Sequence, residues 1–257
     1  MTKNKISAVI LKLVTVIISA CAWLLLWELL SRQIDMDFIF PGVKATLARL
    51  FELIVTAQFW RTVLYSLARI LLGLALGVIL GAALAAICKL CPFSEPFVSI
   101  GLTVTKSTPV ASIVMVMWVI IGSASLPTVI AVMMVAPIIW QNLIDAYASI
   151  DKNLVEVARV FDFSRFKTFR YVYAPTLTKY LIPALLTSLG LAWKSGIAAE
   201  VIAYTKKSIG KNIYDAKTLF EGDTLLAWTL VVVLISLMLE YTVKFIYRRA
   251  ARGNAST

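Results

Sequence analysis

The stretch EVARVFDFSRFKTFRYVYAP, from Glu156 to Pro175, holds six charged and six aromatic residues between long apolar segments. The chain has 257 residues, of which 60% are hydrophobic, and its mean hydropathy is +0.87. Soluble domains are about 45–50% apolar, so this composition indicates a membrane-embedded protein. In such a chain we expect the charged, aromatic stretch to form a loop outside the lipid.

Local signals predict a helix–turn–helix in this stretch. Asp151 is placed to cap a helix over residues 152–161, and Ser164 is placed to cap a second short helix. A turn at residues 162–163 separates the two, and Pro175 limits the second helix. The hairpin could rest on lipid headgroups or dock into a cytoplasmic partner. One side is basic and the other is aromatic, because three phenylalanines recur every three residues, namely Phe163, Phe166 and Phe169.

Six apolar segments are each long enough to cross a membrane as a helix of about 20 residues. Lipid offers backbone groups no outside partner, so helices are the expected spanning structure. No Gly- or Ser-rich linker divides the chain, and we predict one domain over residues 1–257. The predicted spans are Ile6–Leu30, Thr62–Cys88, Pro96–Ile121 with Pro109 inside it, Leu126–Ala148, Tyr180–Tyr204 and Thr224–Tyr247.

The distribution of Lys and Arg indicates the orientation, because cytoplasmic loops carry an excess of both. Six crossings place the two termini and the loop at about residues 149–178 on one side. The cations of the opposite loops are accompanied by six acidic residues. We therefore predict that both termini and this loop are cytoplasmic. The cations on that side are Lys3, Lys5, Lys12, Lys152, Arg159, Arg165, Lys167, Arg170, Lys179, Lys244, Arg248, Arg249 and Arg252.

Small residues at regular spacing and one amphipathic segment predict how the helices pack. Residues 40–60 show helical apolar spacing, which favours a helix at the outer membrane surface over a simple loop that re-enters the membrane. The second span carries small residues four apart, a pattern that lets another helix pack closely. The fifth span repeats the pattern. The small residues are Gly73, Gly77, Gly81 and Ala85, and then Ala192, Ser195, Gly196 and Ala199.

Charge inside a membrane span is costly and by default indicates function. Arg69 lies near the outer end of the second span, so we interpret it as reaching the membrane surface. Lys106 precedes Ser107, Thr108 and Pro109 in the third span. Because proline removes a backbone donor, we expect a disturbed helix whose carbonyls and hydroxyls line a polar path through the membrane.

Two further ionisable residues lie in the fifth span. Lys194 is about 21 Å along that helix from Tyr180, at 1.5 Å per residue, which is close to mid-membrane. Glu200 follows six residues later and points about 120° away, so the two are not expected to pair. Each needs another partner, such as Lys106, a second subunit, water or a substrate. We assign Lys194 to the translocation path, and Glu200 either to that path or to a structural role near an outer gate.

Several function classes are excluded. The chain has no His, which removes histidine-based catalysis and most zinc sites, and we predict neither a catalytic residue nor a metal site. Cys88 and Cys91 form a single CxxC, which we interpret as chance at a helix end. The net charge of +11 is spread over short loops rather than a basic stripe, so no nucleic-acid partner is expected. No GxxxxGK[ST] motif is present, so ATP binding is not expected in this chain.

Residues 156–175 resemble the EAA loop of ABC importer permeases, E-A-A-x3-G-x9-I-x-L-P. The matching positions are Glu156, Ala158 and Pro175, with Val172 at the Ile position. The departures are Val157 for the first Ala, Asp162 for the Gly and Ala174 for the Leu. SLARILLG at residues 66–73, Pro109, and GLAWKSGIAAEVIA at residues 190–203 are similar to the nitrate/sulfonate/taurine branch, so the resemblance covers nearly the whole chain.

The resemblance implies an all-α polytopic membrane protein with six transmembrane helices in the type I ABC importer (MetI-like) permease fold. Two copies would form one path in the bacterial cytoplasmic membrane, embedded in lipid. A cytoplasmic ABC ATPase would bind ATP and Mg²⁺, and an extracytoplasmic substrate-binding protein would deliver substrate. The ATPase-coupling residues would be Glu156, Ala158, Asp162, Phe163, Phe166 and Pro175. At Asp162 the usual Gly is missing, but Asp tolerates positive φ better than most residues.

The residues and the resemblance leave more than one substrate class open. The resemblance implies nitrate, a sulfonate, taurine or a similar solute, and the lysines within the spans favour an anionic or carbonyl-rich one. A pyrimidine or other vitamin precursor is the alternative substrate class. The alternative functions are a secondary transporter or channel without an ATPase, an intramembrane enzyme, and the scaffold of a vitamin importer that lacks a binding protein.

Overall fold

The computed structural model describes residues 3–36 and 38–254, and every regular element in those residues is helical, as predicted. Two compact units are present. Unit 1 comprises residues 1–60 and 212–231, and unit 2 comprises residues 61–211 and 232–257.

Some of the cationic side chains used to predict the orientation lie outside the described part of the structure, namely Lys3, Lys5, Lys12, Arg248 and Arg252. The longer helices are α1 (Lys3–Ile34), α2 (Val43–Ile54), α3 (Ala57–Leu90), α4 (Glu95–Ser107), α5 (Val110–Ile121), α6 (Leu126–Ala148), α9 (Ala174–Ile202), α10 (Ile209–Thr218) and α11 (Gly222–Asn254), and α3, α10 and α11 have residues in both units.

In the part of the chain that the structure describes, five helices are long and apolar enough to cross a membrane, and one bent pair makes a sixth candidate. The bent pair replaces the continuous third span that the sequence predicted. The segments 92–107 and 110–121 meet at 106°. Thr108, directly before Pro109, has extended backbone angles (φ −81°, ψ 131°). Proline disfavours the helical conformation in the residue before it, so the chain turns here instead of bending slightly.

Close packing of α3 on α6 holds unit 2 together. A Cβ added to Gly73 would lie 2.5 Å from the carbonyl oxygen of Thr128 in α6, and one at Gly81 would lie 2.6 Å from that of Ala136. Neither backbone atom can move aside cheaply. The small-residue stripe of the second span therefore packs two helices, as predicted. Around it, α5, α6 and α9 share an apolar core that includes Val114, Leu126, Ile130 and Ala199.

Unit 1 is organised around the connection from α1 to α2. The carboxylate of Glu28 in α1 accepts a hydrogen bond from the backbone N–H of Val43, the first residue of α2, at 3.1 Å. The Trp27 indole donates to the carbonyl oxygen of Pro41 at 3.1 Å. The helix predicted within residues 40–60 is thus confirmed as α2, whereas its place at the membrane surface stays a prediction.

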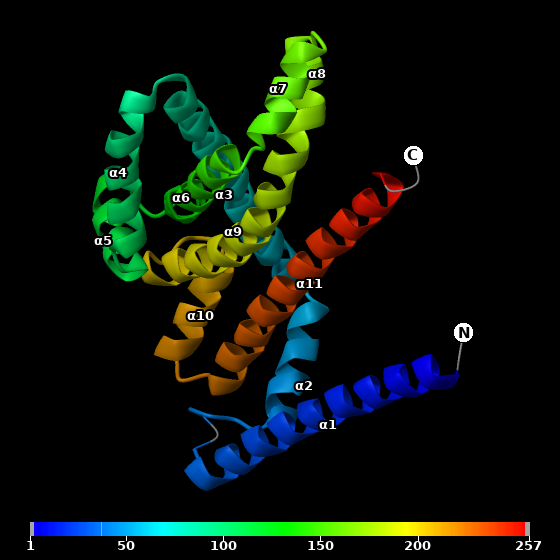
Figure 1. The fold of residues 1–257 in the computed structure, drawn as a ribbon. Helices are drawn as coiled ribbons and strands as arrows, with labels where there is room; N and C mark the ends of the chain where they lie inside the picture. The colour runs from blue at the N-terminus through cyan, green and yellow to red at the C-terminus, as the bar shows by residue number, and fades with distance from the viewer. Residues whose placement is uncertain (1–2, 37, 255–257) are drawn as a thin grey trace. The chain divides into compact units, whose positions relative to one another are not determined.

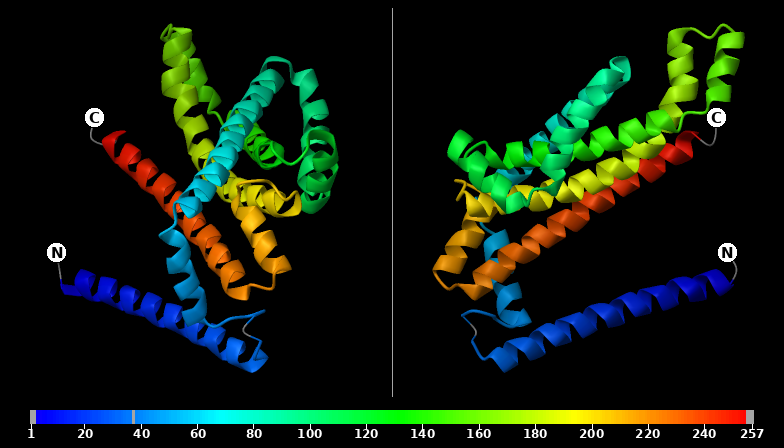
Figure 2. Two further views of the ribbon diagram at one scale, coloured as in Figure 1. Left: turned by 180° about the vertical axis from the view of Figure 1, so that it is seen from behind. Right: turned by 60° about the vertical axis from the view of Figure 1, so that its left-hand side comes forward.

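Between α6 and α9, unit 2 carries a helical hairpin that projects away from the rest of the unit (Figures 1 and 2). It consists of α7 (Lys152–Val160) and α8 (Arg165–Thr168). α8 continues through the π-helical turn η2 (Phe169–Tyr173) into α9. The fifth predicted span therefore belongs to a helix, α9, that begins at Ala174 and not at Tyr180, and Pro175 lies in its first turn instead of separating two helices.

Candidate functional site

The two helix caps predicted for the hairpin are confirmed. The Asp151 carboxylate accepts a hydrogen bond from the backbone N–H of Asn153 at 2.8 Å, at the start of α7. The Ser164 hydroxyl accepts one from the N–H of Lys167 at 3.3 Å, at the start of α8. Such caps satisfy backbone donors that a helix start leaves without partners. The hairpin is therefore specified by its own sequence.

The turn between α7 and α8 depends on a left-handed residue at Asp162. Its φ is +50°, as the family's Gly position led us to expect. The N–H of Phe163 donates to the carbonyl oxygen of Ala158 at 2.9 Å, and the N–H of Asp162 donates to that of Arg159 at 3.1 Å. These two bonds form the Schellman pattern that ends many helices, in which the left-handed residue is usually Gly. Asp162 performs the same role here.

The predicted coupling residues differ in exposure. Glu156, Phe163, Phe166 and Pro175 are exposed on the hairpin and its junction with α9. Ala158 is only 3% exposed, so its side chain belongs to the inside of the hairpin. Phe163, Phe166 and Phe169 stay exposed, and in the described residues no ring contact joins them. The hairpin thus presents the carboxylates of Glu156 and Asp162 and several aromatic groups at its surface, whereas Ala158 acts through packing.

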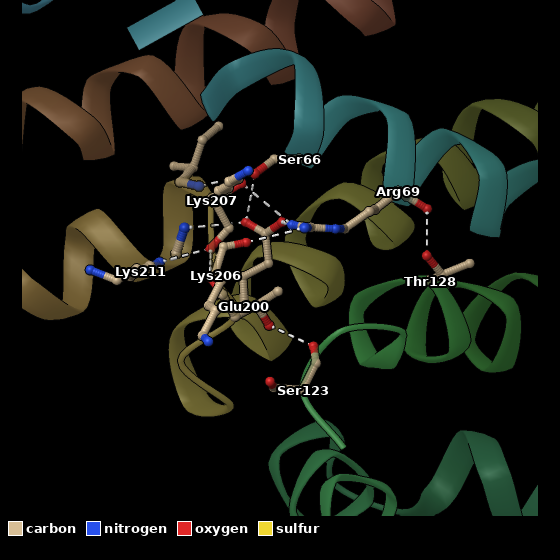
Figure 3. Close-up of polar contacts among 12 residues, drawn as sticks. Ser66, Arg69, Ser123, Thr128, Glu200, Lys206, Lys207 and Lys211 are labelled. Atoms are coloured by element: carbon tan, nitrogen blue, oxygen red, sulfur yellow. Dashed lines mark hydrogen bonds and ion pairs between the residues drawn. The ribbon is translucent and has the colours of Figure 1, made fainter. Parts of the chain in front are cut away.

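A buried carboxylate forms a second polar site in unit 2, at the end of α9 (Figure 3). Glu200 is 0% exposed. Its Oε2 atom accepts hydrogen bonds from the Ser66 hydroxyl at 2.8 Å and from the backbone N–H of Gly210 at 3.2 Å. The Ser66 oxygen in turn accepts one from the N–H of Ile209 at 2.9 Å. Glu200 and Ser66 together satisfy the first two donors of α10, where the helix dipole favours negative charge.

Arg69 joins the same site from α3. Its guanidinium lies 3.8 Å from Oε1 of Glu200, and it donates to the carbonyl oxygens of Lys206 at 3.1 Å and Lys207 at 3.4 Å. The side chain is 24% exposed. Oε1 itself accepts no hydrogen bond in the described structure. The interpretation of Arg69 as a residue that only reaches the membrane surface missed this ion pair. We call Ser66, Arg69, Glu200 and Gly210 the Glu200 cluster.

Close backbone approach makes the Glu200 cluster possible. A Cβ added to Gly210 would lie 2.4 Å from Cβ of Glu200 and 2.5 Å from the backbone nitrogen of Val201. Only a residue without a side chain fits at that distance. The connecting segment is further held by Thr205, whose hydroxyl donates to the carbonyl oxygen of Ser123 at 3.0 Å. The cluster therefore fixes residues 203–211 onto the ends of α3 and α9.

The residues around Pro109 lie at the break between α4 and α5. Lys106 lies in the last turn of α4, and Ser107 is exposed beside it. The Thr108 hydroxyl donates to the carbonyl oxygen of Val104 at 2.7 Å, so that hydroxyl is already paired. No hydrogen bond or ion pair joins Lys106 to Lys194 or Glu200 within the described residues. Their shared place on a translocation path stays a prediction.

Lys194 faces a different surface from Glu200, as the helical spacing predicted. Its side chain is exposed on α9, and it lines a groove with Glu240 and Lys244 of α11. Glu240 forms an ion pair with Lys244 one turn later. Within the described residues no group of three His, Cys, Asp or Glu side chains is arranged to hold a metal ion.

Sequence reasoning identified Glu200 but missed its partners. Ser66 is 134 positions away and lies in a different helix. Its only sequence signal was its place at the start of the SLARILLG stretch. Gly210 stood outside every motif. Contacts between residues so far apart in the chain leave no periodic or local pattern, so they require the folded structure.

Comparison with known proteins places these features in context. The protein family described as binding-protein-dependent transport system inner membrane component matches residues 73–252. The taurine transport system permease protein TauC of Escherichia coli (strain K12) is 24% identical over 230 residues, which cover 87% of this chain and 83% of TauC. The riboflavin transport system permease protein RibX of Chloroflexus aurantiacus (strain ATCC 29366 / DSM 635 / J-10-fl) is 25% identical over 221 residues, covering 85% and 82%.

A solved structure is also similar. The inward-facing MetNI methionine ABC transporter contains a chain that superimposes with a TM-score of 0.57 at 19% identity. The match covers 74% of this chain and 93% of that one. At this identity the likeness concerns the fold.

Proposed function

The chain belongs to the family of inner-membrane components of binding-protein-dependent transport systems, and we propose that two copies of it form the path for a small sulfonate or similar anionic solute. It is a multi-pass permease subunit of an ATP-driven ABC importer with the type I (MetI-like) fold. Its partners are a cytoplasmic ATPase and a substrate-binding protein. ATP hydrolysis belongs to the ATPase chain, where we expect ATP and Mg²⁺ to bind. Family membership argues against a secondary transporter or channel that works without an ATPase.

The observation that carries this proposal is the projecting hairpin of α7 and α8. Its caps and its left-handed turn give it a fixed shape, and Glu156, Phe163 and Phe166 are exposed on it. A hairpin of defined shape with exposed aromatic groups suits docking into a cleft of another protein, since aromatic side chains are enriched at protein–protein interfaces. We assign the coupling role to Glu156, Phe163, Phe166 and Pro175, with Ala158 and Asp162 maintaining the hairpin's shape.

The remaining assignments are proposals of the same kind. Both termini and the hairpin are cytoplasmic, on the distribution of Lys and Arg. The chain then acts as one permease domain in the bacterial cytoplasmic membrane. Lys106, Ser107, Thr108 and Pro109 belong to the translocation path. Glu200 has the structural role near the outer gate, because its carboxylate is committed to Ser66 and Gly210.

The substrate proposal rests on charge and on a relative. TauC is named as a taurine transport permease, and an exposed lysine within the fifth span of this chain suits an anionic solute. The riboflavin permease RibX keeps a vitamin as the alternative substrate class. A thermal-shift screen of the cognate binding protein against taurine, ethanesulfonate, nitrate and riboflavin separates these. Stabilisation by riboflavin alone would overturn the sulfonate proposal.

Co-purification tests the coupling proposal. The tagged full-length chain is expressed with its neighbouring gene products, and the ATPase that remains bound is quantified. Glu156→Arg should abolish co-purification, because it reverses an exposed charge on the hairpin. Glu221→Arg is the matched control, since Glu221 is also exposed but lies outside the hairpin. A Glu156→Arg complex that stays intact and transports would show that the hairpin is not the docking element.

A further inference from the structure

Unit 2 contains a groove of about 560 Å³ between α9 and α11. Thr187, Gly190 and Lys194 of α9 line one wall, and Glu240 and Lys244 of α11 line the other. Sites for small molecules have volumes of about 300–1,000 Å³. The groove shares no residue with the Glu200 cluster or with the hairpin, so neither of those sites accounts for its charged lining.

The charges in the groove are not balanced. Glu240 is paired with Lys244, one turn away on the same helix. Lys194 interacts electrostatically with Glu240 of the groove, but it makes no hydrogen bond and no ion pair within the described residues. Two lysines and one glutamate leave one positive charge, and the Lys194 ammonium carries it. A cation that forms no salt bridge inside a membrane-spanning helix is costly, and by default it indicates a ligand or a path for one.

The glycine beside Lys194 keeps space open. No atom lies within 4 Å of the position that a Cβ at Gly190 would take. By contrast, a Cβ at Gly73 or Gly81 would collide with the backbone of α6. Gly190 therefore does not serve helix packing within this chain. It lies one turn from Lys194 on the same face of α9 and leaves free volume next to the ammonium group.

A third polar group extends this face. The Thr187 hydroxyl donates to the carbonyl oxygen of Pro183 at 3.0 Å, so its donor is used and its oxygen can still accept. Along the groove wall the chain thus offers an acceptor, an open space and a cation. This order suits a small molecule with an anionic end and an uncharged or donor-bearing remainder.

We propose that this groove binds the anionic group of a small solute at Lys194, with the remainder of the solute in the space left by Gly190. The ligand class is a compact organic oxyanion, such as a sulfonate. The proposal deepens the proposed function, because it gives the transported anion a defined subsite within one subunit. An anionic lipid headgroup has the same charge chemistry, so the experiment must distinguish a lipid from a solute.

Equilibrium binding of radiolabelled methanesulfonate tests the proposal. The full-length chain is reconstituted in nanodiscs of phosphatidylcholine, which contain no anionic lipid. Lys194→Met should weaken binding by about tenfold or more, equal to about 1.4 kcal/mol. Lys194→Arg should retain binding, because the positive charge stays. Lys44→Met is the matched control, since Lys44 is an exposed lysine of α2 outside the groove, and its binding should equal that of the unmodified chain.

A second variant tests the space instead of the charge. Gly190→Leu should abolish binding without lowering the thermal unfolding midpoint, since the site around its Cβ is empty. Equal binding by the unmodified chain and Lys194→Met would overturn the proposal. So would absence of methanesulfonate binding together with Lys194-dependent retention of phosphatidylglycerol in native mass spectrometry, which would identify a lipid site. If Lys194→Met instead separates two subunits, the groove is a subunit contact and the proposal is wrong.

A failure of this proposal can be distinguished from a failure of the coupling proposal. Co-purification of the ATPase with Lys194→Met should be unchanged, because Lys194 lies outside the hairpin. Loss of methanesulfonate binding with an intact complex concerns the groove alone. Failure of the unmodified chain to retain any ATPase concerns the coupling proposal alone.

Discussion

Replacing Ser66 by Ala removes the hydroxyl that connects three elements of unit 2. Ser66 lies on α3 and is 0% exposed. Its hydroxyl donates to Glu200 on α9 at 2.8 Å and accepts from the N–H of Ile209, the first residue of α10, at 2.9 Å. The substitution leaves the main chain and the rest of the packing as they are. Its effect therefore reports the value of the hydroxyl within the Glu200 cluster.

Two losses add up in this variant. A hydrogen bond to a charged group contributes about 1.5–3 kcal/mol, and a buried donor left without a partner costs about 1–3 kcal/mol. The N–H of Gly210 still donates to the same Glu200 oxygen at 3.2 Å, which reduces the first loss. We therefore expect the free energy of unfolding to fall by about 3–4 kcal/mol, in the lower part of the summed range.

Ser188→Ala is the matched control and should have the opposite sign. Ser188 is also 0% exposed, but its hydroxyl has no hydrogen-bond partner in the described structure. Removing an unpaired buried hydroxyl takes away a desolvation cost. We expect stability to rise by up to about 1 kcal/mol. The same chemical change at two fully buried positions is thus predicted to act in opposite directions.

Thermal unfolding of the detergent-solubilised full-length chain, followed by tryptophan fluorescence, measures both effects. Amide hydrogen exchange locates them, because Ser66→Ala should accelerate exchange at residues 203–211 before other parts of unit 2. Equal destabilisation by Ser66→Ala and Ser188→Ala would refute the reasoning, since it would mean that the hydrogen bonds of the Glu200 cluster carry no special stability.

Two further predictions concern backbone positions. Gly210→Ala should lower stability by about 1–3 kcal/mol through overpacking, because its Cβ would lie 2.4 Å from that of Glu200. Gly101→Ala, with nothing within 4 Å of its Cβ, should raise stability by up to about 1 kcal/mol. Unfolding midpoints that shift in the same direction in both variants would contradict this reasoning. At Asp162, where φ is +50°, replacement by Gly should preserve ATPase co-purification. Asp162→Val should weaken co-purification, because the left-handed conformation would strain the turn by about 1–2 kcal/mol. An intact complex with Asp162→Val would show that docking does not depend on the left-handed turn.

Local signals predicted most of the hairpin. Asp151 and Ser164 are capping residues immediately before helical segments, and the caps formed as expected. The left-handed conformation at Asp162 followed from the family's Gly at that position and from the tolerance of Asp for positive φ. These features involve residues within a few positions of one another, so the sequence contains all the information that they need.

Two prolines and one glycine show where local sequence information ends. Pro109 breaks its helix completely, because Thr108 before it takes the extended conformation. Pro175 does not break its helix, because the π-helical turn η2 directly before it changes the register of the hydrogen bonds. Gly210 drew no notice in the sequence, yet its lack of a Cβ permits the Glu200 cluster. In each case the outcome depends on what the neighbouring backbone does.

One helix connects the functional elements of unit 2. α9 has 29 residues, which is about 43 Å at 1.5 Å per residue. The hairpin joins its first turn, Lys194 lies in its second half, and Glu200 lies in its last turn. A displacement of the hairpin by an ATPase would reach Lys194 and Glu200 through α9, in which Pro183 lies between the hairpin and Lys194. Because Glu200 is anchored to Ser66 and Gly210, a displacement that is not absorbed by bending at Pro183 must either carry residues 203–211 along or break the Glu200 cluster. Ser66→Ala should then alter ATP-driven transport and leave ATPase co-purification intact, which makes the cluster and the hairpin separable by experiment.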